Sequence, residues 1–211
     1  MSLIKNGEVF YVIDAETTGY DPADSDVIQL SAIKVYNDNG EYEVQGTFNE
    51  YINPGYPLPP DIVDFNKRNK TGITDELLSE SPTADVVISD FVRFMGDDLE
   101  PPTMVFHHAA FDKPFIDKMT MVHLGFKYNA NIVDTLDISR DCLPDVKHNL
   151  GAMFALTDKK YSADNPDFHN ALSDVYATLD VLDYLEKEYF SSALDLTDNQ
   201  GQGGMARVRQ R

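Results

Sequence analysis

The sequence has little of what secreted and membrane proteins depend on. Its one cysteine, Cys142, cannot form an internal disulfide, which is compatible with a reducing cytoplasm. Its longest apolar runs have the length of a strand, far short of the roughly 20 residues that a membrane span needs. Residues 1–5 show no basic region followed by a long apolar stretch, so no signal peptide is expected. These features predict a cytoplasmic protein without a membrane partner.

Basic residues are also scarce. The 17 Lys and Arg residues face 36 Asp and Glu residues, which gives a formal net charge of −19. Most nucleic-acid binders have a basic face, so tight, sequence-independent binding to a duplex is not expected. An acidic, solvated surface accounts for most of the excess. Some of the carboxylates could instead be ligands of bound cations, which would invert the local field and let the protein engage a strand end.

What is present fits one globular α/β domain within the 211 residues. The nearly continuous apolar run at residues 8–14 predicts a buried central strand. Residues 27–36 and 41–52 predict two more strands, joined by a turn at residues 37–40. Shorter strands are predicted at residues 103–106 and 132–133, and helices from residue 81 onward and at residues 112–124, 136–140, 150–156 and 170–189. A meander followed by alternating helices and strands indicates a mixed sheet.

Two further segments are expected to lack regular structure. Residues 53–60 form a proline-rich loop, because proline cannot continue a sheet. Residues 191–211 contain three glycines and no apolar period, which predicts a disordered tail after a folded part at residues 1–190. This arginine-ended tail is either a flexible terminus or a docking segment for a partner protein.

The first candidate for chemistry is the pair Asp14 and Glu16 at the end of the central strand. Because side chains alternate along a strand, both carboxylates can point to the same face. Two acids beside an apolar core are costly unless a cation neutralises them. In a chain with 36 acidic residues, such a pair indicates little by itself.

Three later residues complete a pattern. Asp112 follows a strand and opens a predicted helix, where an ordinary capping aspartate would also fit. His169 and Asp174 lie at the start of the long helix, and five helical residues turn through about 500°, so the two would diverge if both were helical. They can converge if His169 lies on the preceding loop and Asp174 in the second turn. A surface histidine at a helix start is the simpler alternative.

In this order and spacing, the five residues resemble the DEDD-type 3′–5′ exonucleases of the subclass that uses histidine as the base (DEDDh). Within that family, the proofreading epsilon subunits and exonuclease domains of bacterial DNA polymerase III are the most similar. The resemblance extends over residues 9–185, about the whole folded part. Weaker matches occur in the expected order at residues 52–55, 72–77, 134–136 and 148–150.

The resemblance implies a ribonuclease H-like α/β fold, with a mixed five-stranded sheet flanked by helices, and an exonuclease domain at residues 1–190. It also implies two divalent ions, Mg²⁺ or Mn²⁺. Asp14 would bridge both ions, Glu16 and Asp174 would hold the first, and Asp112 would support the second, directly or through water. His169 would take a proton from the attacking water. The terminal nucleotide would contact Ala15, Thr17, Thr18, Gly19, His107, His108 and Phe111.

Two departures from the family concern the substrate. His108 stands where relatives commonly have asparagine, and a basic stretch at residues 67–70 precedes the segment at 71–74. The basic stretch is either a solvated loop or a lip that contacts phosphates. We expect single-stranded DNA as substrate, with the enzyme free-standing or serving a polymerase. The alternatives are an RNA-trimming enzyme resembling ribonuclease T or oligoribonuclease, and a catalytically silent interaction module.

Overall fold

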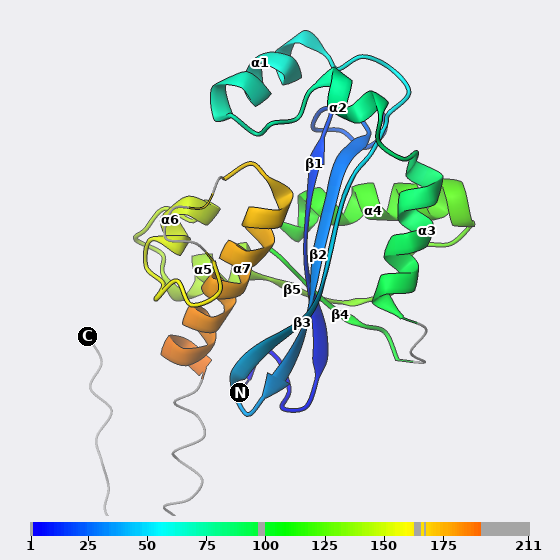
Figure 1. Cartoon of the computed structure of the whole chain (residues 1–211). Coiled ribbons are helices and arrows are strands. Elements are labelled where there is room, and N and C mark those ends of the chain that lie inside the picture. The colour runs from blue at the N-terminus through cyan, green and yellow to red at the C-terminus, as the bar shows by residue number, and fades with distance from the viewer. Residues whose placement is uncertain (1, 97–99, 163–165, 167, 191–211) are drawn as a thin grey trace, which may run out of the picture.

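Five strands form one mixed sheet in the computed structural model, which describes residues 2–96, 100–162, 166 and 168–190 (Figure 1). The strands are β1 (Val9–Thr17), β2 (Val27–Asp38), β3 (Glu41–Tyr51), β4 (Thr103–Phe106) and β5 (Asn131–Asp134). Their order is β3-β2-β1-β4-β5. The pairs β1–β2 and β2–β3 are antiparallel, whereas β1–β4 and β4–β5 are parallel. The predicted mixed five-stranded sheet is confirmed, with β1 at its centre.

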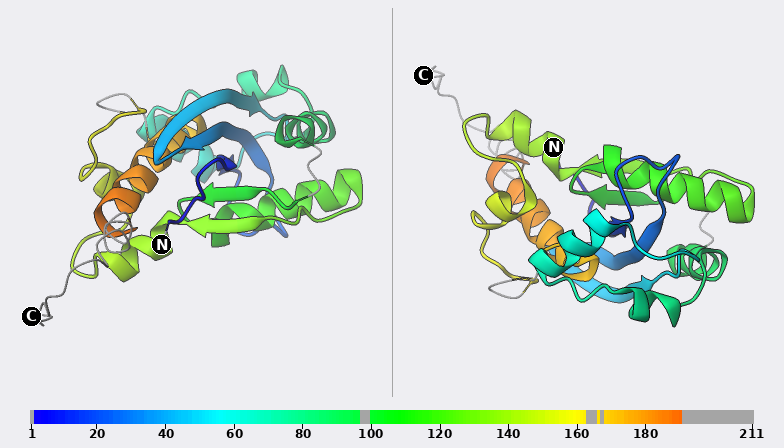
Figure 2. Two further views of the ribbon diagram at one scale, coloured as in Figure 1. Left: turned by 90° about the horizontal axis from the view of Figure 1, so that it is seen from below. Right: turned by 90° about the horizontal axis from the view of Figure 1, so that it is seen from above.

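Helices cover both faces of the sheet (Figures 1 and 2). Helices α3 (Ala84–Met95) and α4 (Ala109–Leu124) pack on one face, and α7 (Ala171–Leu185) packs on the other. The remaining helices are α1 (Pro60–Asn69), α2 (Asp75–Ser79), α5 (Thr135–Cys142), α6 (Leu150–Phe154) and a π-helix at Glu186–Phe190. Helices α5 and α6 pack against α7, and α1 and α2 lie beyond the end of the sheet at which β1 ends. None of the helices in the described ranges is both long and apolar enough to span a bilayer.

The apolar run of β1 reflects burial on both of its faces. Tyr11 and Ile13 pack into the core beneath α3 and α4, whereas Phe10 and Val12 pack into the core beneath α7. This alternation has a consequence for the acids that follow. Even-numbered positions face α7, so Asp14 continues the row of Phe10 and Val12 towards that helix.

The turn between β2 and β3 is also as predicted. Asn39 and Gly40 both have positive φ, at 53° and 89°. A two-residue turn of this kind matches the right-handed twist of the two strands it joins. The hairpin then places β3 at the edge of the sheet, next to β2.

Helix α1 was not predicted, and the expectation of a loop at residues 67–70 is wrong. Pro60 begins the helix, because its fixed φ suits the first helical position. Lys67 and Arg68 lie in the last turn, and Lys70 ends the helix in the left-handed conformation with φ 56°. The helix has few apolar residues, and it is held by tertiary packing of Ile62 and Val63 on the cluster of Leu58, Ile73, Leu78 and Ile28.

Two helix starts differ from the expectation. Helix α3 begins at Ala84 with Thr83 at the N-cap, and the Ser81 hydroxyl donates instead to the Leu77 carbonyl at the end of α2. Helix α4 begins three residues before Asp112, with His108 at the N-cap, so Asp112 is not a capping residue. The tail expected at residues 191–211 lies outside the described residues.

Candidate active site

Three carboxylates meet where β1 ends beside the first turn of α7. Asp14 and Glu16 lie two positions apart on β1, and Asp174 lies on α7. One carboxylate oxygen of each residue lies within 4.8 Å of those of the other two. The same-face geometry of the dyad is therefore confirmed. Asp174 lies in the first turn of its helix rather than in the second.

His169 lies on the loop before α7, as the sequence predicted. Its backbone has a positive φ of 68°, and the helix begins two residues later. The His169 main-chain N–H donates to Oδ2 of Asp174 over 3.1 Å, which holds the loop against the carboxylates. The imidazole packs edge-on against Phe65 of α1, with ring centroids 5.1 Å apart. Burial lowers the pKa of His169, so the ring is neutral at pH 7 and can accept a proton.

Asp112 approaches β1 from the α4 side of the sheet. It is 3% exposed, and its Oδ1 accepts a hydrogen bond of 3.2 Å from the Ala15 main-chain N–H. The carboxylate therefore supports the β1 backbone between Asp14 and Glu16, and it lies outside the three-oxygen cluster. Ala15 was expected to contact the terminal nucleotide, and in this arrangement its N–H is used by Asp112.

Burial is the largest cause of a raised pKa at each of the four acids. It raises the pKa of Glu16 to about 8, with added repulsion from Asp174. It raises the pKa of Asp174 to about 7, against a lowering effect of the His169 N–H. The pKa of Asp14 lies well above its usual value because of burial and then of repulsion by the other three acids. Burial likewise raises the pKa of Asp112 well above its usual value.

A cation would relieve this repulsion. In the part of the chain that the structure describes, no basic side chain forms an ion pair with Asp14, Glu16 or Asp174. Oδ1 of Asp174 is buried there without a hydrogen-bond partner. A donor set of carboxylate oxygens suits hard divalent cations such as Mg²⁺ and Mn²⁺. The residues present therefore fit a divalent metal ion.

The loop after β1 is tightly braced. Thr18 donates its main-chain N–H to the Asp26 carbonyl and accepts the Asp26 N–H at its hydroxyl, both over 2.9 Å. The Thr17 hydroxyl donates to the Gly19 carbonyl over 2.6 Å. A Cβ atom at Gly19 would lie 2.5 Å from Oγ of Ser25, so an alanine at this position would force the Ser25 side chain to move. The side chains of Thr17 and Thr18 are therefore engaged in the loop itself, and substrate would meet its main chain.

His107 is held beside the site by hydrogen bonds to two neighbouring segments. Its Nε2 lies 2.8 Å from the carbonyl oxygen of His148, which can only accept, so Nε2 carries the proton. Its Nδ1 lies 2.8 Å from the Thr135 hydroxyl. The Thr135 hydroxyl donates to the Phe106 carbonyl, and burial lowers the pKa of His107. The segments at 134–136 and 148–150 thus hold His107, and its two ring nitrogens are occupied by protein groups.

His108, Phe111 and Tyr20 form an aromatic lip, in which His108 and Tyr20 are exposed and Phe111 is half-buried against the core. The His108 and Phe111 rings are stacked with centroids 6.1 Å apart, and Tyr20 packs edge-on against Phe111 at 6.4 Å. Tyr20 is 87% exposed, and the sequence offered no signal for it beyond its place after Gly19. His108 has a φ of 100°, a conformation in which asparagine is easier to accommodate than histidine.

Two residues that position parts of the site were not predicted from the sequence. Gln29 of β2 is fully buried opposite Glu16, and its Oε1 accepts the Ala171 N–H at the start of α7 over 3.2 Å. Asp134 accepts the main-chain N–H groups of His108 and Ala109, which fixes the start of α4. For Gln29, the available signal in the sequence was a glutamine inside the apolar run of β2. For Asp134, it was the motif match at residues 134–136.

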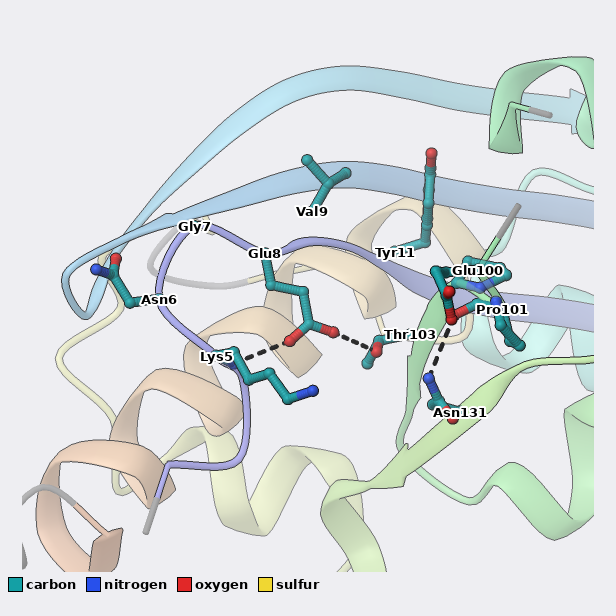
Figure 3. A pocket seen from close by; sticks show the side chains of 11 residues that line it. Lys5, Asn6, Gly7, Glu8, Val9, Tyr11, Glu100, Pro101, Thr103 and Asn131 are labelled. Carbon is teal, nitrogen blue, oxygen red and sulfur yellow. Dashed lines mark hydrogen bonds between the residues drawn. The ribbon is translucent and has the colours of Figure 1, made fainter. Parts of the chain in front are cut away.

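A larger hollow lies at the other end of the sheet, where β1, β4 and β5 begin (Figure 3). It measures about 830 Å³. The Glu8 carboxylate lies in its wall, where it accepts hydrogen bonds from the Lys5 main chain and the Thr103 hydroxyl. Val9 begins β1 here, so the hollow is roughly 20 Å from Asp14 and Glu16 at about 3.3 Å per strand residue. It is separate from the carboxylate cluster.

Most of this chain aligns with sequence relatives. It is 33% identical over 207 residues to a DNA polymerase III PolC-type of Bacillus cereus, and 31% identical over 201 residues to that of Bacillus subtilis. These matches cover 93% and 92% of the chain. The chain spans only about 13% of the length of these relatives.

Solved structures share the fold. Escherichia coli exonuclease I, in complex with a dT13 oligonucleotide, matches 90% of the chain and 43% of its own length, with a TM-score of 0.69 and 20% identity. Exonuclease X, in complex with 5′ overhanging duplex DNA, matches 90% of the chain and 98% of its own length, with a TM-score of 0.61 and 19% identity. The expected ribonuclease H-like sheet and helices are confirmed by these neighbours.

The family model described as exonuclease (RNase_T) matches residues 11–182. This range begins inside β1, before the Asp14–Glu16 dyad, and ends inside α7, after Asp174. It therefore contains all five residues on which the family resemblance was based. The chain belongs to the RNase_T family of exonucleases.

Proposed function

We propose that this chain is a metal-dependent 3′–5′ exonuclease that releases nucleoside monophosphates from the 3′ ends of single-stranded DNA. The observation that carries the proposal is the convergence of the Asp14, Glu16 and Asp174 carboxylates without a basic partner in the described residues. Family membership supports the reaction class. The exonuclease domain is assigned to residues 1–190, which include the whole family match.

The acids would hold two divalent ions, Mg²⁺ or Mn²⁺. Asp14, Glu16 and Asp174 provide a shared cluster of oxygens. Asp112, whose carboxylate accepts the Ala15 N–H outside that cluster, would support the second ion, directly or through water. When bound, such a pair of ions stabilises the attacking and leaving oxygens of an in-line displacement at phosphorus.

His169 would act as the general base. Its ring is neutral at pH 7 because burial lowers its pKa, and a neutral imidazole can take a proton from the attacking water. The main-chain hydrogen bond to Asp174 and the edge-on contact with Phe65 hold the residue next to the acids.

The terminal nucleotide would lie between the braced loop at residues 17–19 and the aromatic lip. Main-chain groups of the loop suit its sugar, and the exposed rings of His108 and Tyr20, which both contact the half-buried Phe111, suit base stacking. A DNA substrate is favoured because exonuclease I and exonuclease X are described in complexes with DNA, and because the sequence relatives are DNA polymerases. The same relatives are the support for proposing a proofreading role beside a polymerase.

The test is a degradation assay on matched single strands of DNA and RNA, with free and blocked 3′ ends. We expect stepwise shortening of the free-ended DNA with Mg²⁺ or Mn²⁺, and none with EDTA or with a blocked 3′ end. Asp14→Ala should abolish hydrolysis, whereas Asp158→Ala, at an exposed acid away from the cluster, should not. Equal cleavage of RNA and DNA would contradict the preference for DNA. Near-normal turnover by Asp14→Ala would contradict the whole assignment, and a chain that binds neither ion would indicate a silent interaction module.

A further inference from the structure

The end of α1 carries an unusual concentration of positive charge for so acidic a chain. Lys67, Arg68 and Lys70 provide three of the 17 basic residues within four positions. All three side chains are exposed. None of them forms an ion pair with a carboxylate of the described residues, whose ion pairs involve other lysines and arginines. We call these three residues the basic lip.

Tertiary structure places the basic lip beside the candidate general base. Phe65, on the same helix, is the residue that packs against the His169 ring at 5.1 Å. Arg68 follows Phe65 by three positions, so it lies on nearly the same side of α1, about 5 Å further along the axis. Both views of Figure 2, with Figure 1, show α1 next to the start of α7, where His169 lies.

Helix stability explains only part of this arrangement. Lysine and arginine in a last turn interact favourably with the helix dipole. That effect accounts for Lys67 and Arg68 at the end of α1, but it does not require a basic residue beyond the helix. Lys70 stands there with φ 56°, where glycine or asparagine would be less strained. A lysine at this position adds charge at a cost in backbone energy.

We propose that the basic lip binds backbone phosphates of the single strand upstream of the nucleotide that is removed. This inference rests on the proposed exonuclease activity. A chain with a net charge of −19 repels a polyanion, and exposed cations without an ion-pair partner, on the helix that contacts His169, would offset that repulsion beside the site. Because of these contacts, the enzyme should bind a strand several nucleotides long more tightly than a single nucleotide ester.

The experiment compares two substrates in the full chain with Mn²⁺. One is a 5′-labelled 20-nucleotide DNA strand, and the other is the p-nitrophenyl ester of thymidine 5′-monophosphate, which has no upstream phosphate. The lip variants are Lys67→Gln/Lys70→Gln and Arg68→Gln. The matched control is Lys5→Gln/Lys127→Gln, which removes two exposed lysines near the opposite end of the sheet. Melting curves confirm that each variant is folded.

For the lip variants we expect a higher KM on the strand with little change in kcat. The slope of log(kcat/KM) against log salt between 50 and 200 mM should become shallower by about 0.7 for each lost phosphate contact. Hydrolysis of the ester should match that of the wild type, and the control variant should keep the wild-type slope. A role in helix stability alone would leave the slope unchanged.

Two results would overturn the inference while leaving the proposed function standing. One is an unchanged KM and salt slope on the strand in both lip variants. The other is an equal loss on strand and ester, which would place the effect at the reacting phosphate. A wild-type protein that hydrolyses neither substrate would overturn the proposed function, and this inference with it.

Discussion

Replacing Asp174 by asparagine should stabilise the metal-free protein, and more at pH 8 than at pH 5. Asp174 is 8% exposed, and burial raises its pKa from 3.8 to about 7. Below pH 3.8 the carboxyl is protonated in both the folded and the unfolded chain. Between pH 3.8 and about 7 the unfolded chain releases a proton that the folded chain retains, so the free energy of unfolding falls as the pH rises.

The size of the effect follows from the shift. One pKa unit corresponds to about 1.4 kcal/mol, so the wild type should lose about 3 kcal/mol between pH 5 and pH 7 through this one group. Asparagine lacks the charge but keeps an oxygen that can accept the His169 N–H. At about 2–4 °C per kcal/mol for a chain of this size, the gain in Tm on substitution should be some 6–12 °C larger at pH 8 than at pH 5.

Thermal melts in EDTA at the two pH values measure this difference. Asp158→Asn, at an exposed acid, is the matched control and should change Tm equally at both. Adding Mg²⁺ should stabilise the wild type, by about 2.7 kcal/mol at 100 times Kd, and stabilise Asp174→Asn less. The reasoning is refuted if the Tm gain of Asp174→Asn is the same at pH 5 and pH 8 without metal.

Three further substitutions test separate parts of the site. His169→Ala should slow hydrolysis by about 10²-fold or more while calorimetric binding of Mn²⁺ survives; loss of metal binding as well would contradict its role as base. Gly19→Ala should destabilise the chain by about 1–3 kcal/mol in denaturant melts through the contact with Ser25. The added substitution Ser25→Ala should recover much of that loss, and an equal loss in both backgrounds would rule out the contact as the cause. His108→Asn should raise Tm by about 2–4 °C, or about 1 kcal/mol, because asparagine accommodates the φ of 100° more easily. A lower Tm would show that the stacking of His108 on Phe111 stabilises the chain by more than the substitution gains in backbone energy.

Local sequence determined the framework of this protein. The alternation of β1 decides which core each side chain enters, so the same-face position of Asp14 and Glu16 followed from a period of two. The hairpin followed from Asn39 and Gly40, whose conformational freedom is a property of the residues themselves. The loop position of His169 followed from the helical period, since a five-residue separation within a helix would have turned it away from Asp174.

Helix α1 could not be predicted from local sequence in this way. Its ten residues include few apolar ones and follow a run of prolines. Its local helix signals, Pro60 at the first position and Lys67 and Arg68 in the last turn, did not by themselves distinguish a helix from a loop. Contacts with residues distant in sequence stabilise it, among them Ile28 beneath Ile62 and Val63 and the His169 ring against Phe65. The placement of Lys67 to Lys70 near the base, and with it the basic lip, could come only from those contacts.

The chemistry of the site divides in the same way. Sequence supplied the identities and order of Asp14, Glu16, Asp112, His169 and Asp174, because residue type and spacing are local properties. Tertiary structure decided that three of the acids share a cluster within 4.8 Å while Asp112 supports the Ala15 main chain behind it. It also decided the raised pKa values, because burial depends on every element packed around a group.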